Sequence, residues 1–399
     1  MNELGPYAKL LTVMIIGVLK ETYPGERRVA LVPDAIPRFM KAGLEVCIER
    51  DAGLDAGFKD SGYKDKGGRI ADSRDQIFSS SDILLQVLGG GANPNSSGEI
   101  DRFRQGQIII GLMDPLSDPK IMQEIAKRGI TTFALELLPR ISRAQGMDTL
   151  SSMATIDGYK AVLLAAESLP KILPMMTTAA GTMLPARVFV IGAGVAGLQA
   201  IATARRLGAV VSAYDMRPAV KEQVESLGAK FFEVKLETKG AETSEGYARE
   251  MGEEFHKRQR ELLALAVAES DIVITTAAVP GKRAPVLITS DMVGPMTPGS
   301  VIIDLAARYG GNCELTRPGE VVISHGVKIM GPIHLASTVP YHASQMYSKN
   351  ISNFLMHLIR EGKFELQLKD EIVRETLVTY DGEVVNPKIL ELLRDSSIT

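Results

Sequence analysis

A glycine-rich turn in the middle of the chain, VFVIGAGVAGLQA, constrains the fold more than any other feature. Gly192, Gly194 and Gly197 follow an apolar, β-branched run and precede a run of helix-forming residues. In a strand–turn–helix unit the first glycine permits a tight turn, the second removes a side chain beside the backbone, and the third lets helix and strand pack closely. We therefore expect a parallel α/β sheet with a dinucleotide pyrophosphate at the N-terminus of the helix.

The next strand, VVSAYD, ends in Asp215, eighteen residues after Gly197. A carboxylate there accepts hydrogen bonds from the adenosine ribose and repels a 2′-phosphate, which favours NAD(H). Arg217 can accept a phosphate, so NADP(H) stays open as an alternative. A plain helix cap is the structural alternative for the glycine-rich turn. The residues expected to contact the cofactor here are Gly192, Ala193, Gly194, Val195, Ala196, Gly197, Asp215, Met216 and Arg217, with Ala277, Ala278 and Val279 at the end of a later strand.

Strand-like and helix-like segments alternate along the chain, which predicts doubly wound parallel sheets. Because 399 residues are too many for one core of usual size, we expect two Rossmann-like α/β domains with a cleft between them. The first comprises residues 1–152 and 333–399, and the second residues 153–332. Long apolar helices at 153–169 and 339–360 are expected to link them. The strands expected in the first domain are 14–19, 44–49, 82–88, 107–113 and 131–138.

Composition excludes several classes of protein. The net charge is −3 and no long Lys/Arg run is present, so the electrostatic footprint of a nucleic-acid binder is missing. Cys47 and Cys313 lie far apart, and no Cys/His spacing suits a metal, so we expect neither a disulfide nor a metal site. No stretch is apolar enough to cross a bilayer. The tail from Leu368 is polar, with a last short helix and no recognisable chemistry.

The junction PRISRAQGMDTLSS, between the strand at 131–138 and the helix at 153–169, carries more hydrogen-bonding side chains than a turn needs. They can position an amide or a ribose, but none is an obvious proton shuttle at neutral pH. The stretch DLAARYGGN, residues 304–312, is expected either near a nicotinamide or as plain loop structure. The junction residues singled out are Arg140, Gln145, Asp148 and Ser151.

Four stretches together resemble one family. GVLKETYPGERRVALVPDA, PRISRAQGMDTLSS, the glycine-rich segment through YDMRP, and DGEVVNP are similar to the NAD(H)-binding component, domain I, of proton-translocating nicotinamide nucleotide transhydrogenases. The resemblance implies that Arg140, Gln145, Asp148 and Ser151 contact the nicotinamide half of NAD(H) at the catalytic site. It also implies that Tyr247 belongs to a mobile loop over the nucleotide. Two residues depart from the family pattern: Gly146 stands for a serine and Arg308 for an acidic residue.

Alanine dehydrogenases share the superfamily and are the rival interpretation. Arg28 matches the arginine that binds the pyruvate carboxylate in those enzymes. Leu88 and Asp114, however, stand where a lysine and a histidine are needed, and Arg308 stands for an aspartate. Direct hydride transfer between two nicotinamides requires orientation rather than an acid and a base. The sequence therefore favours a transhydrogenase over an amino-acid dehydrogenase, with a non-catalytic NAD-binding module as a further alternative.

The resemblance also implies partners. In the family, a homodimeric NAD(H) component passes hydride to NADP⁺ bound on another subunit, and a transmembrane subunit couples this Re/Si-specific transfer to proton translocation. We accordingly expect NAD(H) on this chain, NADP(H) on the partner, and a peripheral position on the cytoplasmic or matrix-equivalent face of a membrane. Contact with the membrane is expected through the partners alone.

Overall fold

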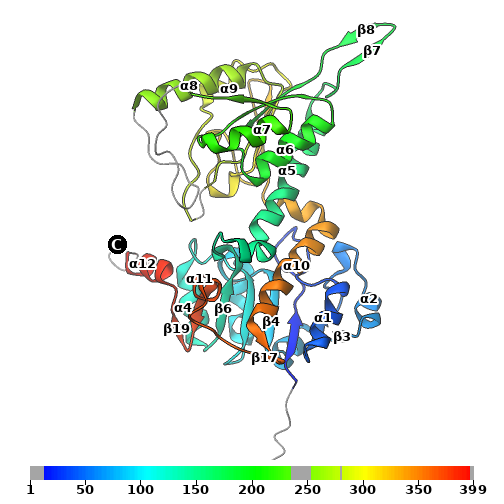
Figure 1. Ribbon diagram of the computed structural model, residues 1–399, viewed down its shortest axis with the longest axis vertical. Helices are drawn as coiled ribbons and strands as arrows, with labels where there is room; N and C mark the ends of the chain where they lie inside the picture. Colours follow the sequence, from blue (N-terminus) through cyan, green and yellow to red (C-terminus); the bar gives the residue numbers. More distant parts are fainter. Residues whose placement is uncertain (1–12, 235–252, 279–280, 396–399) are drawn as a thin grey trace, which may run out of the picture. The chain divides into compact units, whose positions relative to one another are not determined.

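The computed structural model describes residues 13–234, 253–278 and 281–395. The chain divides into two compact units, which are described separately. Unit 1 comprises Met1–Leu150 and Pro340–Thr399, coloured blue to cyan and orange to red in Figure 1, and unit 2 comprises Ser151–Val339, coloured mainly green to yellow. The corresponding boundaries expected from the sequence lie after residues 152 and 332.

The sheet of unit 1 has eight strands among the described residues, in the order β19-β18-β6-β5-β4-β1-β2-β3. The first six strands in the chain are parallel, and β18 joins β6 antiparallel. The strands are β1 (Ile15–Val18), β2 (Glu45–Glu49), β3 (Arg69–Ala71), β4 (Ile83–Leu88), β5 (Ile108–Leu112), β6 (Thr131–Ala134), β18 (Leu377–Tyr380) and β19 (Glu383–Val384). The helices are α1 (Ile36–Lys41), α2 (Asp60–Asp65), α3 (Arg74–Ser80), α4 (Pro119–Lys127), α10 (Pro340–Leu358), α11 (Glu371–Thr376) and α12 (Pro387–Asp395).

The sheet of unit 2 has seven strands in the described residues, in the order β11-β10-β9-β12-β13-β15-β14. The strands are β9 (Arg187–Ile191), β10 (Val210–Tyr214), β11 (Lys230–Phe232), β12 (Ile272–Thr275), β13 (Val301–Asp304), β14 (Val321–Ser324) and β15 (Val327–Met330). The helices are α5 (Thr149–Ser168), α6 (Val195–Arg206), α7 (Lys221–Ser226), α8 (Glu253–Ala268) and α9 (Ser290–Val293). In both units six strands follow the order 3-2-1-4-5-6 of doubly wound nucleotide-binding folds. The predicted fold class, two Rossmann-like parallel sheets, is confirmed.

Local sequence explains why these elements form. Every residue of β4 is buried, so its ILLQVL run forms a central strand of a sheet that is covered on both faces. Helix α3 begins after Ser73, whose side chain accepts the N–H of Gln76, and α4 begins after Asp118, whose side chain accepts the N–H of Ile121. Such caps satisfy N–H groups that the first helical turn leaves unpaired.

Two predictions about unit 1 were wrong in detail. The strand expected at 131–138 ends at Ala134 and continues as a 3₁₀ turn, Leu135–Leu137. That turn brings the Glu136 carboxylate to the backbone N–H groups of Met113 and Asp114 after β5. The polar tail is also more than a last helix, because β18 and β19 extend the sheet beyond β6.

A two-stranded hairpin, β7 (Met176–Thr178) and β8 (Gly181–Met183), extends away from the sheet of unit 2 (Figure 1). No strand was predicted from the sequence at these positions. Leu184, just after it, is 81% exposed, and Met175, just before it, is 63% exposed. Met176 and Met183 are also exposed. Large apolar side chains that gather at an exposed projection are typical of an interaction surface.

Candidate functional site

The glycine-rich turn lies between β9 and α6 in unit 2, as expected. Gly192 has a φ of +94°, and a Cβ there would lie 2.6 Å from the Thr276 hydroxyl oxygen. A Cβ on Gly197 would lie 1.8 Å from the carbonyl oxygen of Gly192. The chain's own backbone geometry and packing therefore require glycine at these two positions.

Gly194 is a glycine for a different reason. It is the N-cap of α6 with φ −75° and ψ −166°, a conformation open to other residues. Among the described residues, a Cβ at this position would approach Arg217 Nη2 alone within 4 Å, at 3.9 Å. Because packing leaves this space open in front of a helix N-terminus, it fits the pyrophosphate of a dinucleotide. The residues of this turn thus fit bound NAD(H).

Asp215 directly follows β10 and is held by four donors. Its Oδ2 accepts the N–H of Ala193 at 2.7 Å and Arg217 Nη2 at 3.0 Å, while its Oδ1 accepts the N–H of Arg217 at 2.8 Å and Arg217 Nε at 3.0 Å. A carboxylate offers about four acceptor positions, so all are in use. A ribose hydroxyl can bind this carboxylate once a donor moves away. Of the two donor residues, Arg217 is the one with room to move, because its side chain is 25% exposed whereas Ala193 is buried.

Neighbouring strand ends complete this edge of the sheet. The Thr276 hydroxyl donates to the carbonyl oxygen of Gly192 at 3.0 Å. The Asn312 side chain accepts the N–H of Ala277 at 3.0 Å and donates to its carbonyl oxygen at 2.7 Å. These bonds fix the Ala277 backbone beside the glycine-rich turn. Ala278 follows and is exposed, and Val279 lies outside the described residues.

The stretch from Asp304 to Asn312 begins at the last residue of β13 and contains the 3₁₀ turn Ala307–Tyr309, and its place near a nicotinamide stays a prediction. The Asp304 carboxylate is fully buried and accepts the hydroxyl groups of Thr275 and Thr316. It also accepts the backbone N–H groups of Ala306, Asn312 and Cys313. Asn312 was not predicted to act separately from this stretch, although an asparagine after two glycines at a strand end is a usable signal. Arg308 is exposed in the 3₁₀ turn Ala307–Tyr309.

The polar junction folds as a 3₁₀ helix, Ser142–Met147, followed by α5. Arg140 and Gln145 are exposed, and Asp148 and Ser151 are half-buried. The first three belong to unit 1, whereas Ser151 belongs to unit 2 with the glycine-rich turn. A role for these four residues at a nicotinamide stays a prediction, as does that of Tyr247, which lies outside the described residues.

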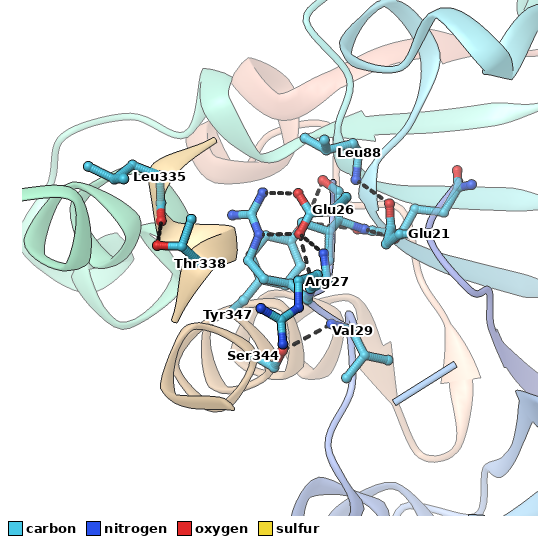
Figure 2. Close-up of polar contacts among 12 residues, drawn as sticks. Glu21, Glu26, Arg27, Val29, Leu88, Leu335, Thr338, Ser344 and Tyr347 are labelled. Atoms are coloured by element: carbon cyan, nitrogen blue, oxygen red, sulfur yellow. Dashed lines mark hydrogen bonds and ion pairs between the residues drawn. The ribbon is translucent and has the colours of Figure 1, made fainter. Parts of the chain in front are cut away.

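The carboxyl edge of the sheet in unit 1 carries buried charges (Figure 2). Arg28 is 4% exposed, and its Nε and Nη2 donate to the two carboxylate oxygens of Glu26 at 2.7 and 2.6 Å. The Glu21 carboxylate accepts the N–H groups of Val87 and Leu88. Burial, with a contribution from Glu26, raises the pKa of Glu21 to about 8. The Arg28 charge is balanced within the chain by its ion pair with Glu26.

The positions that matter for amino-acid chemistry lie at this edge too. Leu88 ends β4 and is 1% exposed, and Asp114, just after β5, has a φ of +47°. A buried leucine carries no titratable group, and a carboxylate stands in place of the histidine. Leu88 and Asp114 thus occupy the two positions at which the sequence comparison with alanine dehydrogenases leads us to expect a lysine and a histidine.

Replacement of Glu136 by glutamine is expected to stabilise the protein more at pH 8 than at pH 5. Burial raises the pKa of Glu136 to about 7, above its ordinary 4.5, so the folded protein keeps a proton that the unfolded chain releases between these values. This group's contribution to the free energy of unfolding therefore falls as pH rises through that window, by up to about 3 kcal/mol. Glutamine keeps an acceptor for Met113 and Asp114 and removes the titration. Urea unfolding at both pH values tests this, and a difference between variant and parent that is constant with pH would contradict it.

No group of three His, Cys, Asp or Glu side chains suited to a metal ion occurs in residues 13–234, 253–278 and 281–395. In the same part of the chain, no helix is long and apolar enough to span a membrane. Cys47 and Cys313 are both buried free thiols.

These observations define the class of protein: two doubly wound units, one of which carries a dinucleotide-binding turn with an open helix N-terminus. Residues 17–157 match the family described as alanine dehydrogenase/PNT, N-terminal domain, and residues 161–387 match alanine dehydrogenase/PNT, C-terminal domain. The chain therefore belongs to the alanine dehydrogenase/PNT family.

Within the family, the chain is more similar to the transhydrogenase relatives than to the alanine dehydrogenases. The first part of NAD(P) transhydrogenase subunit alpha from Rhodospirillum rubrum is 47% identical over 379 residues, 94% of this chain and 99% of that protein. Alanine dehydrogenase of Bacillus subtilis is 26% identical over 379 residues, 93% of this chain and 92% of that protein. The crystal structure of transhydrogenase from Sinorhizobium meliloti, 43% identical, superposes with a TM-score of 0.84 over 93% of this chain and 100% of that chain. The resemblance to the transhydrogenase NAD(H) component is confirmed, and these relatives support an oxidoreductase-related transhydrogenase subunit.

Proposed function

We propose that the chain is the NAD(H)-binding subunit of a proton-translocating NAD(P)⁺ transhydrogenase, which passes hydride from NADH to NADP⁺ held on a partner subunit. The observation that carries this proposal is the substitution of the acid/base groups in unit 1. Buried Leu88 and Asp114 stand where an amino-acid dehydrogenase needs lysine and histidine, and Arg28 is neutralised by Glu26. A hydride donor and acceptor that meet directly need neither group.

Each site residue then has a defined task. Bound NADH supplies a hydride from C4 of its nicotinamide. The N–H groups at the start of α6 bind the pyrophosphate in the space beside Gly194, and Asp215 binds the adenosine ribose after Arg217 has moved. Arg140, Gln145, Asp148 and Ser151 orient the nicotinamide, Tyr247 closes over the nucleotide, and hydride transfer follows the Re/Si-specific geometry of the family.

Partners complete the proposal. NADP(H) is bound by a second subunit, and a transmembrane subunit couples transfer to proton movement and holds this chain at the cytoplasmic or matrix-equivalent face. The R. rubrum relative is named as one part of an alpha subunit, which supports the existence of further subunits. We propose a homodimer, for which the exposed methionines of the β7–β8 hairpin offer an apolar contact surface.

A mixing experiment separates this proposal from its alternatives. The chain is combined with an NADP⁺-loaded partner subunit and NADH, and the formation of NADPH is followed. The proposal predicts NADPH formation that depends on both proteins. Oxidation of NADH by pyruvate and ammonia without the partner would instead identify an amino-acid dehydrogenase. NADH binding with neither activity would identify a non-catalytic module.

A further inference from the structure

The carbonyl oxygen of Gly146, in the middle of the polar junction, accepts two side-chain amides from α10. Asn350 Nδ2 donates to it at 3.0 Å and Asn353 Nδ2 at 2.8 Å. We infer that Asn350 and Asn353 are positioning residues for hydride transfer, because they hold the junction in the shape that presents Gln145 and Asp148. This inference rests on the proposed function of the junction.

The Asn353 amide is itself held in place. Asn353 Oδ1 accepts Arg38 Nη1 of α1 at 2.7 Å, which points the amide nitrogen of Asn353 toward Gly146. Asn350 is 6% exposed. Helix α10 is anchored in the core of unit 1 by side chains with no exposure, including Tyr347 and Phe354. The Gly146 carbonyl group thus fixes the junction to α10. Without these bonds the Gly146 peptide could rotate.

The junction benefits from such an anchor because its backbone hydrogen bonds are of the 3₁₀ type. It is a 3₁₀ helix, a conformation with poorer hydrogen-bond geometry than an α-helix. The N–H of Asp148 donates to the carbonyl oxygen of Gln145 across Gly146, at 3.3 Å. A rotation of the Gly146 peptide therefore moves Gln145 and Asp148, two of the four residues that the proposed function places at the nicotinamide. A displacement of about 1 Å at a hydride-transfer site can slow the reaction about 100-fold.

The same contact explains the glycine where the family resemblance leads us to expect serine. A Cβ on Gly146 would lie 3.2 Å from Asn353 Nδ2, which is tight for such a contact. To fit a side chain at 146, Asn353 Nδ2 would have to move by a few tenths of an ångström. Gly146 and Asn353 are therefore coupled, and we expect a larger residue at 146 to be accommodated best with a smaller residue at 353.

The test compares Asn353→Ala, Gly146→Ser, Asn353→Ser and the Gly146→Ser/Asn353→Ser double variant. Lys349→Ala, an exposed position on the same helix, is the matched control. The NADH dissociation constant, the melting temperature and the hydride-transfer rate constant with an NADP⁺-loaded partner are measured for each. We expect the single variants at 146 and 353 to transfer hydride roughly 5- to 20-fold more slowly, with dissociation constants changed less than about twofold.

The double variant is expected to transfer hydride no more slowly than Asn353→Ser alone, because once the Asn353 amide is gone a serine at 146 has no amide to displace. Two independent, multiplying effects would overturn the inference, as would rates that fall in step with NADH affinity and melting temperature. Hydrogen exchange at the backbone amides of Gln145 and Asp148 tests separately whether Asn353 anchors the junction. Unchanged exchange in Asn353→Ala would overturn it, whereas faster exchange supports it. An absence of transfer by the parent protein would remove the proposed function without altering this exchange result.

Discussion

Replacement of Gly194 by valine is expected to weaken NADH binding about 100-fold or more while the melting temperature stays within about 3 °C of the parent. A Cβ at this position approaches Arg217 Nη2 alone among the described residues, at 3.9 Å, and the backbone conformation suits any residue. The branched side chain would fill the space in front of α6 and keep the pyrophosphate from its N–H groups. The loss of that interaction corresponds to about 3 kcal/mol of binding. Calorimetric titration with NADH and thermal unfolding measure the two quantities.

Gly197→Ala is the matched comparison for this prediction. Its added Cβ would lie 1.8 Å from the carbonyl oxygen of Gly192, so we expect lower thermal stability together with weaker binding. A Gly194→Val variant that unfolds as early as Gly197→Ala would show that the space beside Gly194 serves packing. Such a result would count against a pyrophosphate site.

Arg140→Ala and Asp148→Asn are expected to slow hydride transfer about 10- to 100-fold while the NADH dissociation constant changes less than about threefold. Binding is dominated by the pyrophosphate and ribose contacts in unit 2, whereas these two side chains are proposed to orient the nicotinamide. Single-turnover measurements with an NADP⁺-loaded partner give the transfer rate, and titration gives the dissociation constant.

Arg102→Ala and Asp75→Asn provide the controls. Arg102 and Asp75 form an exposed ion pair of unit 1, far along the chain from the junction, and their replacement makes the same two chemical changes there. Both controls are expected to transfer hydride at the parental rate. Equal losses of binding and transfer in the junction variants, or no loss in either, would show that the junction is structural.

Much of the architecture could be predicted from the sequence because buried strands and capped helices leave strong local patterns. The run of six buried residues in β4 and the glycine-rich turn after β9 are examples. The strand pair β18 and β19 could not be predicted, because its short segments carry polar residues and β18 is stabilised by pairing with β6, more than 200 residues earlier, while β19 pairs with β18. The early end of β6 likewise depends on the bonds that Glu136 makes with Met113 and Asp114.

The candidate site likewise has features that the sequence predicted and features that only the structure shows. Spacing together with the flanking strand and helix patterns indicated Gly192, Gly194 and Gly197, but geometry was needed to separate the two glycines that the fold requires from the one that leaves space open. The paired hydrogen bonds from Arg217 Nε and Nη2 to the Asp215 carboxylate depend on the local backbone conformation, which residue types do not reveal. The contact of Asn353 with Gly146 joins residues more than 200 positions apart, so no local pattern could signal it.

The fate of the transferred hydrogen tests the central claim most directly. NADH carrying deuterium at the transferred C4 position is mixed with this protein and its NADP⁺-loaded partner, and the products are analysed by mass spectrometry. Direct transfer predicts that the deuterium appears in NADPH and does not exchange with water. Unlabelled NADPH, or deuterium found in alanine after addition of pyruvate and ammonia, would contradict the account.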